Sequence, residues 1–146
     1  MTDTRKQAAA IPFRVTELGS TEVLLVSLSG GGWGFPKGGV KKGSSPESTA
    51  RLESLEEAGV LGEIVAPPLG KYVYRKQGKK QVVSVFPLRV TRMLDRWQEE
   101  HERIRIWIPI AEAHALLRRG TKIERFLTLL QHRLLAESCV LLRRVA

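Results

Sequence analysis

Three glutamates, Glu53, Glu56 and Glu57, have the residue type and spacing best suited to chemistry in this sequence. Residues at positions i, i+3 and i+4 share one face of an α-helix, so these carboxylates would project from the same side within about one turn. Like charges at this spacing cost an isolated helix about 0.2–0.5 kcal/mol per pair, which favours a cation that gathers them. A hard divalent ion, Mg²⁺ or Mn²⁺, suits such an oxygen site, and Mg²⁺ commonly binds substrate phosphates as well. The alternative is a solvated acidic face that pairs with nearby lysines and arginines.

Basic residues dominate the rest of the chain. The 146 residues include 24 Lys and Arg against 15 Asp and Glu, which gives a net charge of +9 and an isoelectric point near 10.2. Residues 64–94 contain no acidic residue and seven basic ones, Lys71, Arg75, Lys76, Lys79, Lys80, Arg89 and Arg92. This charge favours an anionic partner: a nucleic acid, a phosphorylated metabolite or an acidic membrane.

Length and composition predict one soluble domain. With 42% hydrophobic residues, a chain of 146 residues can bury about 68–70% of the surface that its unfolded form exposes. Cys139 is the single cysteine and cannot form a disulfide within the chain, which predicts a reducing compartment, the cytoplasm. No apolar run approaches the roughly 18 residues of a membrane span, and residues 1–10 lack the apolar core of a signal peptide. We therefore expect no membrane association.

Hydrophobic patterning predicts the strands that must support the glutamates. We expect a flexible N-terminal segment at residues 1–10, a domain at residues 11–137 and a C-terminal tail at residues 138–146. Apolar and β-branched runs predict strands at residues 21–28, 62–66, 71–76, 80–92 and 103–108. Pro87 predicts a bulge or a sheet edge in the fourth of these strands.

Capping residues and glycines predict the helices and the loop before the first of them. Helices are expected at residues 45–58, 110–118 and 123–136, the first with Ser45 as N-cap and Gly59 as its stop. Residues 29–43 contain seven glycines and one proline, which predicts a shaped loop that leads into the first helix. Strands mixed with helices in this order predict an α+β or mixed-sheet sandwich in one domain.

The glutamates belong to a longer pattern. A Trp-x-x-Pro-Lys-Gly approach at residues 33–38 leads through Gly39, Gly43 and the helix to Glu53, and Glu56-Glu57 are followed by Gly59-Val60. This loop-helix-loop resembles the Nudix hydrolase signature: glycine, five residues, Glu, seven residues, Arg-Glu, an aliphatic residue, any residue, Glu-Glu, any residue, Gly and an aliphatic residue. When the signature starts at Gly38, six of its nine positions are kept. The three positions that differ are Ser44, Leu52 and Ser54.

The similarity continues outside this motif, over roughly residues 11–130. Residues 8–14, 70–75, 86–90, Trp97, 103–107 and 110–113 are similar to bacterial Nudix proteins related to diphosphoinositol polyphosphate phosphohydrolases. The resemblance implies a single α/β/α sandwich around a mixed β-sheet. It also implies a Mg²⁺-dependent hydrolase that cleaves a pyrophosphate bond in a polyphosphorylated small molecule, such as a diphosphoinositol polyphosphate or a dinucleoside polyphosphate.

The resemblance also implies roles for individual residues. Glu53 and Glu57 would bind the divalent ion, and Glu56 would be either a third ligand or the base for the attacking water; the proton of that water would go to Glu53 or to Glu56. A further acidic ligand would come from Glu99, Glu100 or Glu102. The residues expected to bind the substrate phosphates are Arg14, Lys37, Gly38, Gly39, Lys42, Lys79, Lys80 and Arg105.

Two departures from the motif bear on activity. Leu52 stands where the family has an arginine that orients the adjacent carboxylate, and misplacement by about 1 Å can cost about 10²-fold in rate. Arg51 lies roughly 100° around the helix and cannot simply substitute. Ser54 replaces an aliphatic residue that packs under the helix. The alternative function is therefore a catalytically weak Nudix-fold module that binds or senses a polyphosphate ligand.

Nucleic-acid binding through the basic strands ranks last among the functions considered. The basic residues lie beside an acidic metal site, and the sequence contains no nucleic-acid recognition motif. We therefore expect an anionic small-molecule partner, and no feature of the sequence predicts an oligomeric state.

Overall fold

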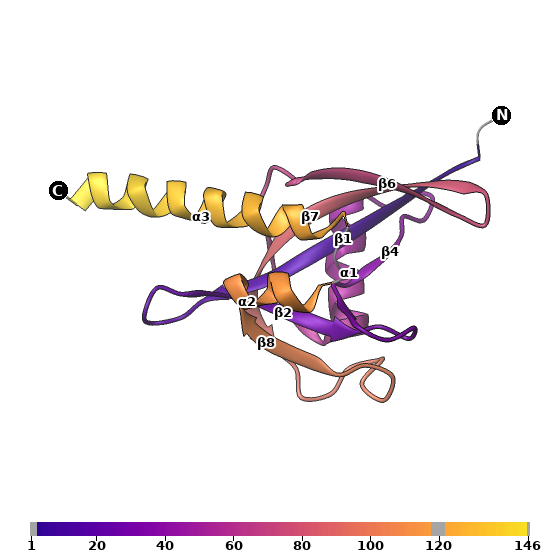
Figure 1. The fold of residues 1–146 in the computed structure, drawn as a ribbon, viewed down its shortest axis with the longest axis horizontal. Coiled ribbons are helices and arrows are strands. Elements are labelled where there is room, and N and C mark those ends of the chain that lie inside the picture. Colours follow the sequence, from indigo (N-terminus) through magenta and orange to yellow (C-terminus); the bar gives the residue numbers. More distant parts are fainter. Residues whose placement is uncertain (1–2, 118–121, 146) are drawn as a thin grey trace.

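The computed structural model describes residues 3–117 and 122–145, and these residues form eight strands and three helices (Figure 1). The strands are β1 (Thr4–Val15), β2 (Thr21–Ser27), β3 (Trp33–Gly34), β4 (Lys37–Gly39), β5 (Val60–Ile64), β6 (Gly70–Lys76), β7 (Lys79–Met93) and β8 (Arg105–Pro109). The helices are α1 (Pro46–Ala58), α2 (Ile110–Leu116) and α3 (Glu124–Val145). The five predicted strands are confirmed, with ends displaced by at most two residues. The predicted end of the second helix at residue 118 lies outside the described residues.

Strand β1 runs through the middle of the sheet, so the prediction of a flexible segment at residues 1–10 is wrong from residue 4 onward. β1 pairs in parallel with β7 from Thr4 opposite Lys80 to Phe13 opposite Arg89, and antiparallel with β2 and β4. Ala8, Ala9 and Ala10 are fully buried. Three alanines have low β-propensity and show no alternation, but a strand that is covered on both faces requires none.

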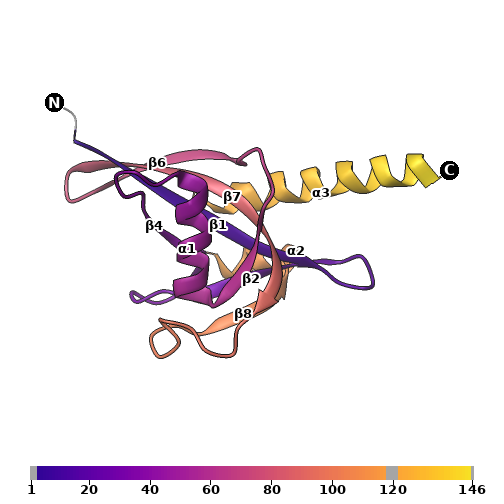
Figure 2. The ribbon, with the colours of Figure 1, turned by 180° about the vertical axis from the view of Figure 1, so that it is seen from behind.

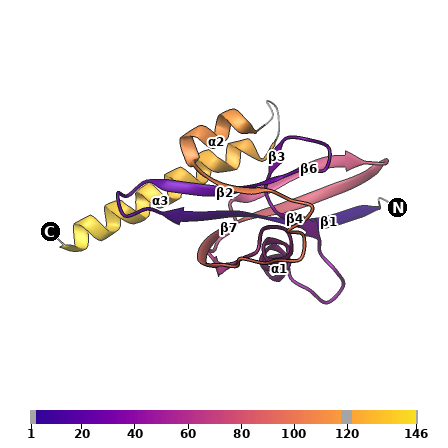
Figure 3. The ribbon, with the colours of Figure 1, turned by 90° about the horizontal axis from the view of Figure 1, so that it is seen from below.

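Helices cover both faces of this one mixed sheet, whose strand order is β3-β2-β1-β7-β5 (Figure 3). β4 lies beside β1, β6 beside β7, and β8 beside β2. Successive side chains of β1 alternate between the two layers: Ala8 and Ala10 pack in the core beneath α1, whereas Ile11 and Phe13 pack in the core beneath α2 and α3. The prediction of an α+β, α/β/α sandwich in one domain is confirmed.

Pro87 lies in an interior strand, so the prediction of a sheet edge there is wrong. β7 pairs with β1 on one side and with β5 and β6 on the other. Pro87 occupies the point where pairing passes from β6 to β5, and its carbonyl accepts a hydrogen bond from the N–H of Val65 at 3.0 Å. Proline has no backbone N–H to donate, and here that gap falls between the β6–β7 and β5–β7 hydrogen-bond ladders, so neither ladder loses a bond. The bulge lies four residues further along the same strand, where Thr91 of β7 is the extra residue opposite the step from Leu61 to Gly62 of β5.

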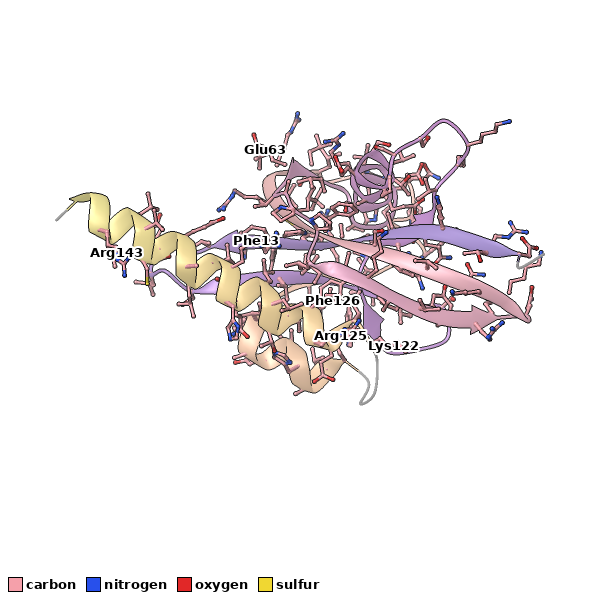
Figure 4. All side chains as sticks on the ribbon, turned by 90° about the horizontal axis from the view of Figure 1, so that it is seen from above. Phe13, Glu63, Lys122, Arg125, Phe126 and Arg143 are labelled. Carbon is pink, nitrogen blue, oxygen red and sulfur yellow. The ribbon has the colours of Figure 1, made fainter. Side chains whose placement is uncertain are left out.

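Helix α3 extends well beyond the sheet (Figure 1), so the predicted tail at residues 138–146 is helical up to Val145. Near its start, Phe126 points toward the sheet and is 1% exposed, whereas Arg143 lies at the far end of the helix (Figure 4). Within the described residues, no helix is long and apolar enough to cross a membrane.

Candidate functional site

Helix α1 carries the three glutamates, and capping contacts define its ends. The Ser45 side chain accepts a hydrogen bond from the N–H of Ser48, the Ser48 side chain accepts one from the N–H of Ser45, and Pro46 starts the helix. At the other end Gly59 adopts a left-handed conformation with φ of 64°, and its N–H donates to the carbonyl of Leu55. The buried side chains of α1 are small or polar, which allows the helix to lie close to the sheet (Figure 2).

Strand β4 brings Gly38, one of the two predicted glycines, against Glu53 of this helix. A Cβ atom on Gly38 would lie 2.2 Å from Oε1 of Glu53, far inside an ordinary contact of 3.4 Å. Only glycine therefore lets the chain pass the Glu53 carboxylate at this distance. Nothing lies within 4 Å of the corresponding position on Gly39.

Glu57 is the most buried of the three glutamates, with 8% of its surface exposed. Its Oε2 accepts a hydrogen bond from the backbone N–H of Lys37 at 2.9 Å, and its Oε1 accepts one from Nη2 of Arg103 at 3.1 Å. Burial raises the pKa of Glu57 to about 7, although both of these donors act in the opposite direction. Burial also raises the pKa of Glu53, and repulsion from Glu56 and Glu99 adds to the effect.

The segment between β7 and β8 docks against the C-terminal end of α1 through three hydrogen bonds. The N–H of Leu94 donates to the carbonyl of Gly59, the N–H of Glu99 to that of Glu56, and the indole N–H of Trp97 to that of Glu57. Glu99 is therefore the predicted outside glutamate that the structure brings next to the helix. Glu100 instead lies near Arg96 and His101.

The carboxylates fit a divalent metal in donor type. In the described part of the chain, no three His, Cys, Asp or Glu side chains are placed to hold a metal ion as they stand. Glu53 and Glu57 nevertheless supply only oxygen donors, and a divalent cation would offset the burial and repulsion that raise the pKa of each carboxyl. Hydrogen bonds occupy two of the roughly four lone-pair positions of Glu57. Metal binding would therefore require rearrangement of these side chains.

A cleft of about 910 Å³ opens beside Glu53, which is the one acidic residue that lines it. Its basic lining residues are Arg5, Lys6, Lys41, Lys42, Lys76 and Lys79, contributed by β1, the loop after β4 and the β6–β7 hairpin. The predicted residues Gly39, Lys42 and Lys79 therefore come together here. Lys80 does not line the cleft, because neighbouring residues of a strand point to opposite faces. We call this space the basic cleft.

A second cleft, of about 380 Å³, adjoins the site through Lys37. Its aromatic lining residues are Trp33, Phe35, Tyr72 and Tyr74, and Lys37 and Lys122 add positive charge. The Lys37 ammonium donates to the hydroxyl of Tyr74 at 3.1 Å, and that hydroxyl donates to Oε1 of Gln7 at 2.8 Å. Because the backbone N–H of Lys37 binds Glu57, one residue connects this aromatic cleft to the carboxylates.

Two predicted phosphate-binding arginines lie elsewhere. Arg14 is six residues along β1 from the partner of Gly38, about 20 Å away at strand spacing. Its side chain binds Glu22 at 2.8 Å and stacks on Trp107. The Arg105 guanidinium donates to the carbonyls of Ala58 and Leu94 and stacks on Trp97. Arg105 thus caps the C-terminal end of α1, where exposed carbonyls favour a cation.

The sequence model of one protein family, the NUDIX domain, matches residues 4–130, which is most of the chain. The chain belongs to the Nudix family. It is 42% identical over 100 residues to Nudix hydrolase 17, mitochondrial, of Arabidopsis thaliana. The aligned region covers 66% of this chain and 54% of that protein. It is 35% identical to diphosphoinositol polyphosphate phosphohydrolase 2 of Rattus norvegicus, over 77% of this chain and 63% of that one. The chain thus spans about half to two thirds of the length of these relatives.

Solved structures show the same Nudix fold. The crystal structure of the C. elegans Ap4A hydrolase superimposes with a TM-score of 0.73 at 22% identity and covers 92% of this chain and 99% of that chain. The NUDIX domain of Shewanella oneidensis NrtR, solved with ADP ribose, gives a TM-score of 0.73 at 19% identity over 92% and 90% of the two chains. The curated relatives described above are from a plant and a mammal, so the bacterial subgroup stays a prediction.

The departures from the Nudix motif have different structural outcomes. Ser54 is fully buried, as the aliphatic motif position requires, and its hydroxyl donates to the carbonyl of Ala50 at 2.8 Å. Leu52 is 45% exposed and supplies no charge to the carboxylates. Sequence reasoning missed Arg103 and Tyr74 as site residues. Arg103 lies 46 positions after Glu57. It falls in a segment that shares the family resemblance, but nothing in that segment marks it as a partner of the glutamates.

Proposed function

We propose that this Nudix protein hydrolyses a phosphoric anhydride bond in a polyphosphorylated small molecule, with Mg²⁺ or Mn²⁺ as cofactor. The observation that carries the proposal is the basic cleft, where Glu53 of α1 lies among six lysines and arginines. A phosphate chain would be neutralised by these side chains while its end lies beside the carboxylates of the motif. A phosphorylated metabolite therefore fits better than a nucleic acid or a membrane.

The proposed roles follow the positions of the side chains. Glu53 and Glu57 would hold the metal, and Glu56 would either join them or, like Glu53, serve as the base. When bound, the metal would neutralise phosphate charge and lower the pKa of a bound water. Gly38 keeps space for the Glu53 carboxylate, and the backbone N–H of Lys37 orients Glu57. Lys42 and Lys79 would bind phosphates away from the reacting bond.

The aromatic cleft favours a substrate that has a planar base beside its phosphates. The Tyr72 and Tyr74 rings lie 6.2 Å apart in a stacked arrangement, and Trp33 lines the same space. Aromatic side chains of this kind bind the faces of nucleobases. Among the candidates we therefore favour a dinucleoside polyphosphate over a diphosphoinositol polyphosphate.

A turnover screen tests the function. Diadenosine polyphosphates, diphosphoinositol polyphosphates and nucleoside diphosphate sugars would be incubated with the protein and Mg²⁺, and phosphate and nucleotide release would be measured. We expect turnover by the wild type, loss of turnover in Glu57→Gln, and normal turnover in Glu63→Gln, whose exposed side chain on β5 lies outside the site. Equal rates for the wild type and Glu57→Gln would refute the proposal.

The same screen separates the alternative function, a polyphosphate-binding module. Leu52 in place of the motif arginine is the observation that favours it. Metal-supported binding of a panel compound by calorimetry, without turnover of any compound, would support the module. The predicted location in the cytoplasm is part of this proposal, since a reducing compartment matches the single exposed cysteine, Cys139.

A further inference from the structure

Arg103 makes a three-way contact that no residue of the Nudix motif supplies in this chain. Its Nη2 donates to Oε1 of Glu57 at 3.1 Å, its Nε to Oε1 of Glu99 at 2.9 Å, and its Nη1 to the carbonyl of Ser27 at 3.0 Å. The three partners belong to α1, to the segment before β8 and to β2. With 20% of its side chain exposed, the guanidinium is fixed at the junction of three elements.

The guanidinium charge acts on two motif glutamates. It directly binds Glu57, and it also lowers the pKa of the Glu53 carboxyl against the effect of burial. Arginine suits this role because its planar fork holds several acceptors in fixed directions, whereas lysine offers one point charge. In the Nudix motif an arginine before the first helix glutamate brings a guanidinium to the carboxylates, and Leu52 supplies none.

We propose that Arg103 positions the Glu57 carboxylate in this chain and so supplies, from outside the helix, the guanidinium that the motif lacks at Leu52. Arg103 is a positioning residue, since it acts through the carboxylates. The inference rests on the proposed function for its consequence in catalysis. Its structural part, the placement of the Glu57 side chain, is independent of that function.

The contacts around Arg103 indicate that its substitution leaves the segment attached. The N–H of Ser27 donates to the carbonyl of Ile104, the N–H of Ile104 donates to the hydroxyl of Ser27, and Glu99 stays bonded to the backbone of Glu56. None of these bonds uses the Arg103 side chain. Arg103→Met, which keeps the length and the apolar stem, is therefore the variant to test.

The control variant is Arg96→Met, because Arg96 lies in the same segment and is 84% exposed, and among the described residues its ion pair is with Glu100, at 3.5 Å. On a compound that the wild type turns over, we expect Arg103→Met to lower kcat by about 10²-fold with KM changed by less than about threefold, since carboxylates displaced by about 1 Å cost that much. Arg96→Met should match the wild type. Arg103→Lys should fall between Arg103→Met and the wild type.

A second substitution tests the replacement directly. Leu52→Arg restores the motif residue, so it should recover at least about tenfold of kcat in the Arg103→Met background and change the wild type little, a coupling that a double-mutant cycle measures. If Arg103→Met lowered kcat only because part of the protein unfolds, the fall in kcat would equal the fall in the folded fraction measured by circular dichroism. Leu52→Arg would then not recover kcat. That result would overturn the inference.

Crystal structures give a readout that needs no turnover. We expect the Glu57 carboxylate to occupy one conformation beside Lys37 N–H in the wild type and to be displaced or divided between conformations in Arg103→Met. An unmoved Glu57, or kcat within threefold of the wild type, would overturn the inference. If the wild type turned over no compound, the proposed function would fail, and the two crystal structures would still decide the role of Arg103.

Discussion

Substitution of Gly38 by alanine tests the closest contact in the site. The added Cβ would lie 2.2 Å from Oε1 and 2.3 Å from Cδ of Glu53, where ordinary contacts begin at 3.4 Å. The carboxylate must therefore retreat by about 1.2 Å, and a misplacement of about 1 Å costs about 10²-fold in rate. We expect kcat of Gly38→Ala to fall by about that factor in the presence of Mg²⁺.

The fall in kcat should come from displacement of the Glu53 carboxylate and not from a less stable fold. The obstructing atoms belong to the end of a flexible side chain, and the φ of Gly38 does not lie in the left-handed region, so alanine is tolerated by the backbone. Gly30→Ala is the matched control, because nothing lies within 4 Å of its Cβ position and it lies outside the site. Both variants gain the same restriction of the unfolded chain, so their melting temperatures should agree within a few degrees.

The assay measures kcat, KM and thermal unfolding for the wild type and both alanine variants, on a compound that the wild type turns over. Retention of more than a third of the wild-type kcat by Gly38→Ala would refute the reasoning. It would show that Glu53 moves aside without consequence and that its present position is irrelevant to the chemistry. A parallel fall in Gly30→Ala would assign the effect to the loop rather than to the carboxylate.

Two further predictions concern stability. Since the pKa of Glu57 rises from 4.5 to about 7 on folding, the contribution of this group to the stability of the metal-free protein should be fully present below pH 4.5, and on the order of 3 kcal/mol of it should be lost as pH rises through 7. Glu57→Gln should therefore melt higher than the wild type at pH 8 in EDTA and equally at pH 4.5, and a pH-independent difference would contradict this. Gly62→Ala should cost about 1–3 kcal/mol or more by chemical denaturation, because its Cβ would lie 2.2 Å from the backbone oxygen of Arg89, and stability equal to that of Gly30→Ala would disprove it.

The parts of the fold that sequence could predict are those with local signals. Ser45, Pro46 and Gly59 mark both ends of α1 by capping chemistry, and the structure uses them for that purpose. The central strand β1 was missed because burial of Ala8, Ala9 and Ala10 depends on helices distant in sequence. Tertiary packing decided that element, and intrinsic propensity did not.

The residues of the candidate site likewise divide into those that a local sequence pattern marks and those that only the tertiary fold brings to the site. The glutamate spacing follows from helix geometry, so their common location was predictable from sequence alone. Arg14 and Arg105 were expected at the phosphates from the resemblance. A positive charge in a sequence does not specify which face of the fold it occupies, and in the structure both guanidinium groups bind protein acceptors and stack on aromatic rings. Arg103 could not be found because its role exists only after β8 pairs with β2 and brings the preceding segment to α1.

The net charge of +9 conceals two charge clusters of opposite sign in the site, the motif glutamates and the basic cleft, and each needs a counter-charge. Glu57 and Glu53 are held where burial raises their pKa, a state that a cation would relieve. The lysines and arginines of the basic cleft repel one another unless an anion joins them. A metal-bound phosphate chain would satisfy both groups at once, because it carries positive charge at one end and negative charge along its length. The fold thus keeps two unfavourable charge clusters next to each other, and the class of ligand that we propose as substrate would neutralise both.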